Sequence, residues 1–398
     1  MTSRALAERT PKFWTPIALD GVADDPHVTL CQLNWDLYHE APYKYPMFKD
    51  LTTMSKCKGS NLQTRLLSEL WREYEQNADG YNHVQPTAFV FHESRVGSTL
   101  VANTFGSSKE ALVFSESGPP VTCLLRCRTC TAEQNKDRFR KLILLMGASP
   151  VHKYLFFKFQ SISTTEMKKA LGYFPSVPWA FIFRQPVQTI MSHLDKKKGG
   201  SGPCLRYRSR PYPEARAAIE QWIDKDTPVV KASKEAACAG HLNMLCLRAL
   251  SAYDKHALNT DKSTPRGMLI NYEALPGAVP RLFLPQLAGV LPNHEWMANI
   301  AVNTKFYSKA SVARRSKSLS TTHWKGDSKD KDARATDMMR KWTDRIMTKS
   351  YYKMNNHSAQ LASRVASKDM RRELNIHNGV GFAEAVYWKH LASMEEYE

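Results

Sequence analysis

The stretch FHESRVGSTL, residues 91–100, places a glycine among residues that can hold an anion. An apolar run precedes it and an apolar segment follows it, which predicts a turn between a strand and a helix. Gly97 allows the backbone to approach a ligand closely, and the helix after it presents free N–H groups and the positive end of its dipole. Arg95, Ser98 and Thr99 supply further donors. The stretch therefore predicts a phosphate-binding loop.

This loop differs from the loop of ATP-binding enzymes. In the Walker A pattern G-x-x-x-x-G-K-[ST], a lysine follows the second glycine; with Gly97 in that place, Ser98 stands at the lysine and His92 at the first glycine. The apolar run 179–183 ends in Arg184, where a Walker B aspartate would hold Mg²⁺. A P-loop small-molecule kinase is therefore the weaker alternative.

A second stretch, FIFRQPVQTIMSHL, contains Arg184, Pro186 and Ser192. A proline near the first turn of a helix has its φ already suited to helix formation. Arginine and serine at the end of a strand and on the following helix can both reach one phosphate, which arginine binds strongly. The alternative roles are a surface ion pair for Arg184 and a helix-face hydroxyl for Ser192.

Together the two stretches resemble the sulfotransferases that depend on 3′-phosphoadenosine 5′-phosphosulfate (PAPS). Their 5′-phosphosulfate loop reads [RK]-x-G-[ST]-[ST], and their 3′-phosphate motif is an arginine, a proline two residues on and a serine eight residues on. The resemblance covers roughly residues 87–345. It implies PAPS as co-substrate, no required metal, and a donor site formed by Arg95, Val96, Gly97, Ser98, Thr99, Arg184 and Ser192.

Two further residues suit the chemistry of sulfuryl transfer. Glu116 follows the apolar run 111–114 and is predicted to be the base that takes the proton of the acceptor; some members of the family carry a glutamate in this region. Lys158, in KYLFFKF, stands where related enzymes place a lysine near the oxygen between sulfate and phosphate. Arg95 is predicted to assist it. The structural alternatives are a loop-capping role for Glu116 and a surface lysine at 158.

A basic, polar stretch over 305–334 contains Arg314 and Lys325, which we expect to contact the 3′-phosphate or the adenine. Many members of the family carry a basic segment late in the chain. The match is loose here, because Trp324-Lys325-Gly326 repeats only part of the R-K-G motif of the cytosolic members.

The elements that must position these residues are short apolar runs alternating with helical segments. The runs cover residues 88–91, 111–114, 154–159, 179–183 and 268–272. Such alternation predicts an α/β fold, a three-layer sandwich with a central parallel sheet and a P-loop-like phosphosulfate loop. Polar residues follow each run, and ligands in such folds lie beyond the carboxyl ends of the strands.

The expected domain organisation has three parts. Residues 1–86 form an irregular, aromatic-rich arm followed by a helix that begins at Asn61, residues 87–345 form the sulfotransferase domain, and residues 346–398 form a C-terminal helical extension. Within the domain, 195–262 reads as an insertion on the acceptor side, with helices at 214–223 and 236–252.

Composition limits the function classes. The chain has 398 residues, 42% hydrophobic, which is typical of a globular protein. A net charge of +18 favours anionic partners. We expect a small-molecule or carbohydrate acceptor and neither nucleic acid nor membrane as partner; a basic nucleic-acid-binding protein without catalysis is the non-enzymatic alternative. The sequence leaves the oligomeric state open. It contains no signal-peptide-like segment, so a cytoplasmic location is expected.

Eight cysteines are too few for a disulfide scaffold in a chain of this length, and reduced thiols are expected. Cys123, Cys127 and Cys130 have the C-x₃-C-x₂-C spacing with which radical S-adenosylmethionine enzymes hold a [4Fe–4S] cluster. A cluster or a structural zinc at these residues is therefore an alternative.

Overall fold

The computed structural model describes most of the chain. The described residues are 10–20, 24–78, 80–127, 130–195, 202–223, 229–260, 264–306, 326–374 and 376.

A five-stranded parallel sheet with helices between its strands confirms the predicted α/β class. Its strand order is β10-β9-β5-β8-β6. The strands are β5 (Pro86–His92), β6 (Ala111–Ser115), β8 (Tyr154–Lys158), β9 (Trp179–Phe183) and β10 (Gly267–Asn271). All five apolar runs of the sequence are therefore strands. Every residue of β6 and β9 is buried, as expected of parallel strands that are covered on both faces.

The chain divides into two compact units, and the division falls within β5. The first unit comprises residues 1–89, 99–163 and 292–324, and the second comprises 90–98, 164–291 and 325–398. The phosphate loop up to Ser98 and Arg184 belong to the second unit, whereas Thr99, Glu116 and Lys158 belong to the first.

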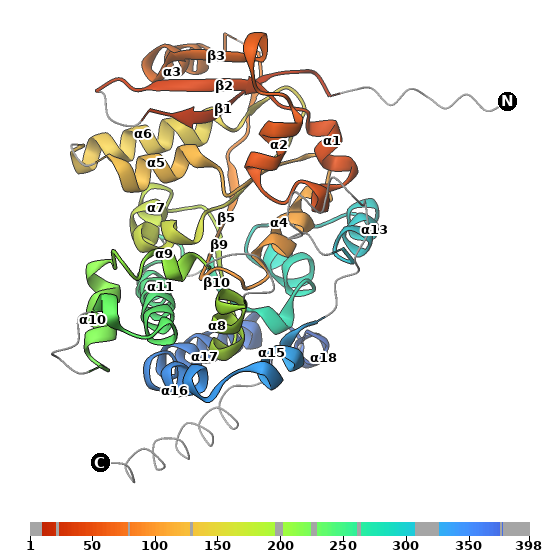
Figure 1. The fold of residues 1–398 in the computed structure, drawn as a ribbon. Helices are drawn as coiled ribbons and strands as arrows, with labels where there is room; N and C mark the ends of the chain where they lie inside the picture. Colours follow the sequence, from red (N-terminus) through yellow and green to blue (C-terminus); the bar gives the residue numbers. More distant parts are fainter. Residues whose placement is uncertain are drawn as a thin grey trace. The chain divides into compact units, whose positions relative to one another are not determined.

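The first unit contains an antiparallel sheet, β1-β2-β3, that the sequence analysis missed. The predicted irregular arm is wrong here. The helix expected from Asn61 is present only from Leu67 onward, because residues 62–66 form a strand. In β3, Leu62 pairs with Cys31 and Leu66 with His27, and this pairing overrides the helical spacing of the leucines. Helices α5 and α6 pack against β1 (Figure 1). The elements are β1 (Trp14–Leu19), β2 (His27–Gln32), α1 (Trp35–Glu40), α2 (Phe48–Met54), β3 (Leu62–Leu66), α3 (Leu67–Gln76), β4 (Asn82–His83), α5 (Gly118–Arg126), α6 (Ala132–Leu145), β7 (Ala148–Ser149) and α13 (His294–Asn303).

The second unit is mainly helical. The long helix α11 contacts α7, α8, α16 and α17, and α17 packs on β10, where the Asn271 side chain donates to Asn355 Oδ1 at 2.8 Å. The helices predicted at 214–223 and 236–252 are confirmed as α10 and α11. The helices are α7 (Met167–Tyr173), α8 (Pro186–Leu194), α9 (Pro203–Arg206), α10 (Pro213–Glu220), α11 (Lys234–His256), α12 (Leu284–Gln286), α15 (Ser328–Arg334), α16 (Asp337–Ile346), α17 (Thr348–Val365) and α18 (Lys368–Glu373). Helix α4 (Ser98–Gly106) begins at the division between the units.

Six of the eight cysteines are paired, so the expectation of reduced thiols is wrong. The disulfides are Cys31–Cys57, Cys127–Cys130 and Cys204–Cys238. Partners that lie 26 and 34 residues apart in sequence meet only in the folded chain, which is why spacing did not reveal them. Since Cys127 and Cys130 are bonded to each other, they do not offer the thiolates that the cluster or zinc alternative requires.

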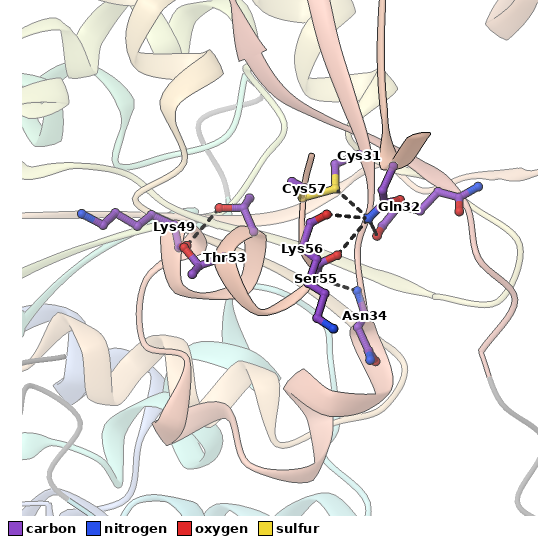
Figure 2. The surroundings of a disulfide bond; sticks show 10 residues. Cys31, Gln32, Asn34, Lys49, Thr53, Ser55, Lys56 and Cys57 are labelled. Atoms are coloured by element: carbon purple, nitrogen blue, oxygen red, sulfur yellow. Dashed lines mark hydrogen bonds between the residues drawn. A yellow bond between two sulfur atoms is a disulfide. The ribbon is translucent and has the colours of Figure 1, made fainter. Parts of the chain in front are cut away.

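The Cys31–Cys57 disulfide links β2 to the turn after α2, and Figure 2 shows the polar contacts beside it. The Asn34 backbone N–H donates to Ser55 Oγ at 2.9 Å. The Asn61 amide donates to the Ser55 carbonyl at 2.8 Å and lies 3.5 Å from Cys31 Sγ. Backbone and side-chain contacts thus hold the same turn that the disulfide closes.

Within the part of the chain that the structure describes, no helix is long and apolar enough to cross a membrane. The same residues include no group of three or more His, Cys, Asp or Glu side chains placed to hold a metal ion.

Candidate functional site

The phosphate loop has a backbone conformation that side chains rarely adopt. Ser94, Arg95 and Gly97 have φ angles of 78°, 60° and 78°, in the left-handed region. For non-glycine residues this conformation costs on the order of 1 kcal/mol or more and persists only where the surroundings impose it. Loops that contain such residues are the ones in which successive backbone N–H groups form anion-binding concavities.

His92 helps to impose this conformation. Its Nδ1 accepts a hydrogen bond from the Ser94 N–H at 3.0 Å, and its carbonyl accepts one from Thr164 Oγ1 at 3.3 Å. The buried imidazole therefore supports the loop from the end of β5, a role that the sequence did not indicate.

Two hydroxyls at the start of α4 are buried and lack a partner. Ser98 is 1% exposed and Thr99 is 4% exposed, and neither hydroxyl oxygen has a hydrogen-bond partner among the described residues. Leaving a buried polar group unsatisfied costs roughly 1–3 kcal/mol. At a helix N-terminus, two such donors fit an anionic ligand.

Gly97 is required for steric reasons as well as for its φ angle. A Cβ at this position would lie 2.9 Å from Cδ2 of Tyr272 and 3.1 Å from Cδ1 of Leu275. The Tyr272 ring therefore packs directly against the loop backbone, which only glycine permits.

Arg184, predicted to bind the 3′-phosphate, is buried in a polar cluster at the end of β9. Its guanidinium lies over the ring of Tyr272, with the central carbon 3.7 Å from the ring centroid. Its Nε donates to Gln188 Oε1 at 2.7 Å, and one terminal nitrogen donates to Asp327 Oδ1 at 2.7 Å and to Ser328 Oγ at 2.9 Å. Only 2% of the side chain is exposed.

Ser192 lies two turns into α8, and its hydroxyl donates to the Gln188 carbonyl at 3.0 Å. Pro186 occupies the first turn of the same helix, as expected, after the N-cap Gln185. Arg184 thus forms a buried ion pair and not the surface ion pair given as its alternative, whereas Ser192 forms a bond within its own helix, in line with its alternative.

The register of the parallel strands explains why Tyr272 meets Arg184. In the β9–β10 pair, Phe183 is opposite Asn271, so the residues that follow, Arg184 and Tyr272, emerge side by side at the carboxyl ends. The sequence analysis left Tyr272 without a place in the site.

Glu93 connects the loop to three other segments of the second unit. Its Oε1 accepts from the Arg184 backbone N–H at 2.9 Å and lies 3.2 Å from Thr189 Oγ1, and its Oε2 lies 3.0 Å from Cys246 Sγ. Burial raises the pKa of Glu93 to about 7, and these hydrogen bonds offset only part of the rise. The carboxyl therefore fixes the start of the loop to the main chain at Arg184.

In the first unit, Glu116 and Lys158 form an ion pair at neighbouring strand ends. Ser115 is opposite Lys158 in the β6–β8 pair, so Glu116 follows directly beside the lysine. Glu116 has a φ of 59°, and its N–H donates to the Lys158 carbonyl at 2.6 Å. The Lys158 side chain is fully buried, whereas that of Glu116 is 19% exposed. A partly accessible carboxylate next to a buried cation can accept a proton while the cation faces developing negative charge.

Arg314 and Lys325 lie outside the described residues. Val96 is buried within the loop and Arg95 is partly buried. Glu93, Tyr272 and Asp327, the partners of the loop and of Arg184, were not predicted from the sequence. Among these, only Glu93 lies within one of the two motif stretches, directly after β5.

No family model matches the chain, and no curated protein sequence matches it. Solved structures similar to it include three sulfotransferases, the family that the two motifs resemble. A sulfotransferase domain from the curacin biosynthetic pathway is 12% identical over 55% of this chain and 78% of its own, with a TM-score of 0.31. A sulfotransferase from Mycobacterium avium is 11% identical over 58% and 71%, with a TM-score of 0.35. One from Alicyclobacillus acidocaldarius is 10% identical over 72% and 99%, with a TM-score of 0.33. Because these TM-scores are below 0.5, the function of this chain has to be inferred from its site.

Proposed function

We propose that the protein is a sulfotransferase that moves a sulfuryl group from PAPS to a hydroxyl or amine of a small-molecule or carbohydrate acceptor. The observation that carries the proposal is the pair of buried hydroxyls, Ser98 and Thr99, that lack partners among the described residues at the end of a loop with left-handed backbone. Arg95 adds a positive charge to the same loop. An anion bound there satisfies the hydroxyls and takes up the free N–H groups at the start of α4.

Binding of the donor is assigned to the residues that the motifs single out. Arg95, Val96, Gly97, Ser98 and Thr99 hold the 5′-phosphosulfate through side-chain donors and backbone N–H groups. The 3′-phosphate is assigned to Arg184, with Ser192, Arg314 and Lys325 as further predicted contacts. Nothing in this assignment requires a metal ion, because arginine and lysine can neutralise the phosphate charge.

For the chemical step, Glu116 accepts the proton from the acceptor hydroxyl or amine as its oxygen or nitrogen bonds to sulfur. The bond between sulfur and the bridging phosphate oxygen breaks, and its electron pair stays on the phosphate. Lys158 stabilises the negative charge that grows on that oxygen, assisted by Arg95. In the described structure Lys158 is paired with Glu116, so the proposal requires the lysine to exchange that carboxylate for the leaving phosphate.

The cytoplasmic location expected from the sequence remains a prediction. Three disulfides argue against it, because disulfides form and persist mainly in oxidising compartments.

Calorimetry with 3′-phosphoadenosine 5′-phosphate in EDTA tests donor binding. We expect the protein to prefer this nucleotide to ATP, Arg184→Ala to reduce the preference, and Thr99→Val to weaken binding about tenfold by removing one donor. Thr104→Val is the matched control, since Thr104 is a buried threonine in the same helix whose hydroxyl donates to the Leu100 carbonyl at 3.0 Å. Equal affinity of the wild type for the two nucleotides would show that the donor is not PAPS.

Glu116→Gln tests the base. The variant keeps the size of the side chain and loses the proton acceptor, so transfer should fall by at least about a hundredfold while nucleotide binding is retained. Glu110→Gln is the control, because Glu110 also pairs with a lysine of the first unit, Lys153, but does so on the exposed surface. Full turnover by Glu116→Gln would remove Glu116 from this role.

A further inference from the structure

Asp327 is bonded to the guanidinium of Arg184, the group to which the 3′-phosphate is assigned. Its Oδ1 accepts from Arg184 at 2.7 Å, while its Oδ2 lies 2.8 Å from the Lys331 ammonium one turn along α15. One carboxylate therefore bridges two buried cations. Burial alone would raise the pKa of Asp327, but the hydrogen bonds and charges of Lys331 and Arg184 outweigh it and hold the pKa below its ordinary value.

Other groups also contact the guanidinium. Tyr272 covers one face, and Gln188 Oε1 accepts a hydrogen bond from the Nε–H. Ser328 shares the terminal nitrogen with Asp327. Because Arg184 is only 2% exposed, a phosphate that binds the terminal nitrogen now bonded to Asp327 has to displace that carboxylate.

The acidic residues around this cluster have different partners. Asp327 contacts the Arg184 side chain directly, whereas Glu273 accepts from Ser328 Oγ at 2.6 Å and Asp332 accepts from the Gln188 amide at 2.9 Å. Asp327 is 26% exposed, so it lies at the rim of the cluster and can turn into solvent. A phosphate brings more charge and more acceptor oxygens than a carboxylate and is the stronger ligand for arginine.

We propose that Asp327 is an intramolecular competitor of the 3′-phosphate at Arg184 and thereby sets how strongly the protein prefers 3′-phosphorylated nucleotides. The inference rests on the proposed function, which supplies the 3′-phosphate as ligand. Arg184 is held in a preformed position by Tyr272 and Gln188, and Asp327 lowers the affinity for the nucleotide because it must be displaced.

The test is the ratio of two affinities, for 3′-phosphoadenosine 5′-phosphate and for adenosine 5′-phosphate, measured by calorimetry. This ratio isolates the 3′-phosphate, so a general loss of stability does not move it. Asp327→Asn keeps the shape of the side chain and removes its charge; we expect the ratio to rise about tenfold, because an ion pair becomes a weaker hydrogen bond from arginine to a neutral amide. Asp330→Asn is the control: it makes the same charge change in α15, but Asp330 is exposed and pairs with Arg334.

The outcomes distinguish failure of the inference from failure of the proposed function. If the wild type prefers the 3′-phosphorylated nucleotide and Asp327→Asn leaves the ratio unchanged or lowers it, Asp327 is a support for Arg184 and the inference is wrong while the proposed function stands. If the wild type shows no preference for the 3′-phosphorylated nucleotide but Asp327→Asn does, the Asp327 carboxylate blocks the phosphate site at Arg184 and the inference holds. If neither shows a preference, both proposals fail. If the affinity ratio rises equally in Asp330→Asn, the effect comes from net charge and the inference is wrong.

Discussion

The guanidinium of Arg184 lies over the ring of Tyr272 at 3.7 Å, and the edge of the same ring packs against Gly97. One aromatic side chain thus contacts both motifs by which the sequence resembles a sulfotransferase. The two motifs are roughly ninety residues apart in the chain, and Tyr272 fixes the arginine relative to the loop. This relationship supplies the first prediction.

Replacing Tyr272 with alanine should weaken binding of 3′-phosphoadenosine 5′-phosphate about tenfold, because a buried cation–π contact contributes roughly 1–2 kcal/mol. Tyr272→Phe keeps the ring and should lose much less nucleotide affinity. Calorimetry on both variants measures the difference. Equal losses in the two variants would assign the effect to the hydroxyl and not to the stacking.

Gly97→Ala should damage the loop more than an ordinary glycine substitution. The new methyl would meet Tyr272 at 2.9 Å in a backbone with φ of +78°. Gly289→Ala separates the two causes, since Gly289 has φ of +64° but a methyl added there would meet nothing within 4 Å. We expect Gly97→Ala to lose nucleotide affinity by about tenfold or more and Gly289→Ala to lose only stability, about 1 kcal/mol. Unchanged nucleotide affinity in Gly97→Ala would contradict this prediction.

Lys158→Met should lower the rate of transfer by about a hundredfold or more, because removing one donor from a charge-stabilising site has effects of that size. Lys153→Met is the matched control in the first unit, where the lysine pairs with Glu110 on the surface. Steady-state kinetics should show the fall in kcat for Lys158→Met alone. A loss confined to KM would indicate that Lys158 binds the donor without acting on the leaving group.

Glu93 predicts a pH dependence of stability. Its pKa is about 7 in the folded protein against 4.5 as its ordinary value. Because the folded protein holds this proton more tightly than the unfolded chain does, the protonated Glu93 contributes its full stabilisation below pH 4.5. This contribution is lost as the pH rises through about 7. Glutamine does not titrate, so the free energy of unfolding of Glu93→Gln should rise relative to that of the wild type by up to about 3 kcal/mol between about pH 4.5 and 8. Urea unfolding of both proteins at the two pH values measures this difference. A difference that stays constant across this range would show that Glu93 is ionised in the folded protein throughout.

The Cys31–Cys57 disulfide should stabilise the first unit. Closing a loop with a sequence separation of 26 is worth about 3 kcal/mol in the chain-entropy account. The double variant Cys31→Ser, Cys57→Ser should unfold at correspondingly lower denaturant concentration, and peptide mapping without reductant should find the 31–57 crosslink in the wild type. Free thiols at both positions in oxidised, folded protein would refute the pairing.

The central sheet was predictable because its strands are buried on both faces and therefore read as uninterrupted apolar runs. The β1-β2-β3 sheet was not, since β3 has exposed and partly buried residues in a pattern that a helix also fits. Local sequence contains no information on how such a segment pairs. The register between β9 and β10, which brings Tyr272 to Arg184, is equally a property of the assembled sheet.

Within the candidate site, residue type and order pointed to the loop, to Arg184 and to the pair Glu116 and Lys158. The partners of these residues could not be found in this way. Asp327 lies 143 positions from Arg184, and Cys246 lies 153 positions from Glu93. Contacts at such separations depend on packing, whereas motifs depend on neighbours in the chain. The assignments of the site residues therefore remain predictions that the variants above examine.

The in-register strand ends have a consequence for how this site can change. Tyr272 meets Arg184 because both follow the opposed residues Asn271 and Phe183, and Glu116 meets Lys158 because it follows Ser115, the residue opposite that lysine. Insertions in the connecting loops leave both pairs intact, whereas deletion of one residue inside β6 or β10 would turn the following side chain to the other face of the sheet. Changes in the loops can therefore alter substrate preference without disturbing these pairs, whereas changes in strand length cannot.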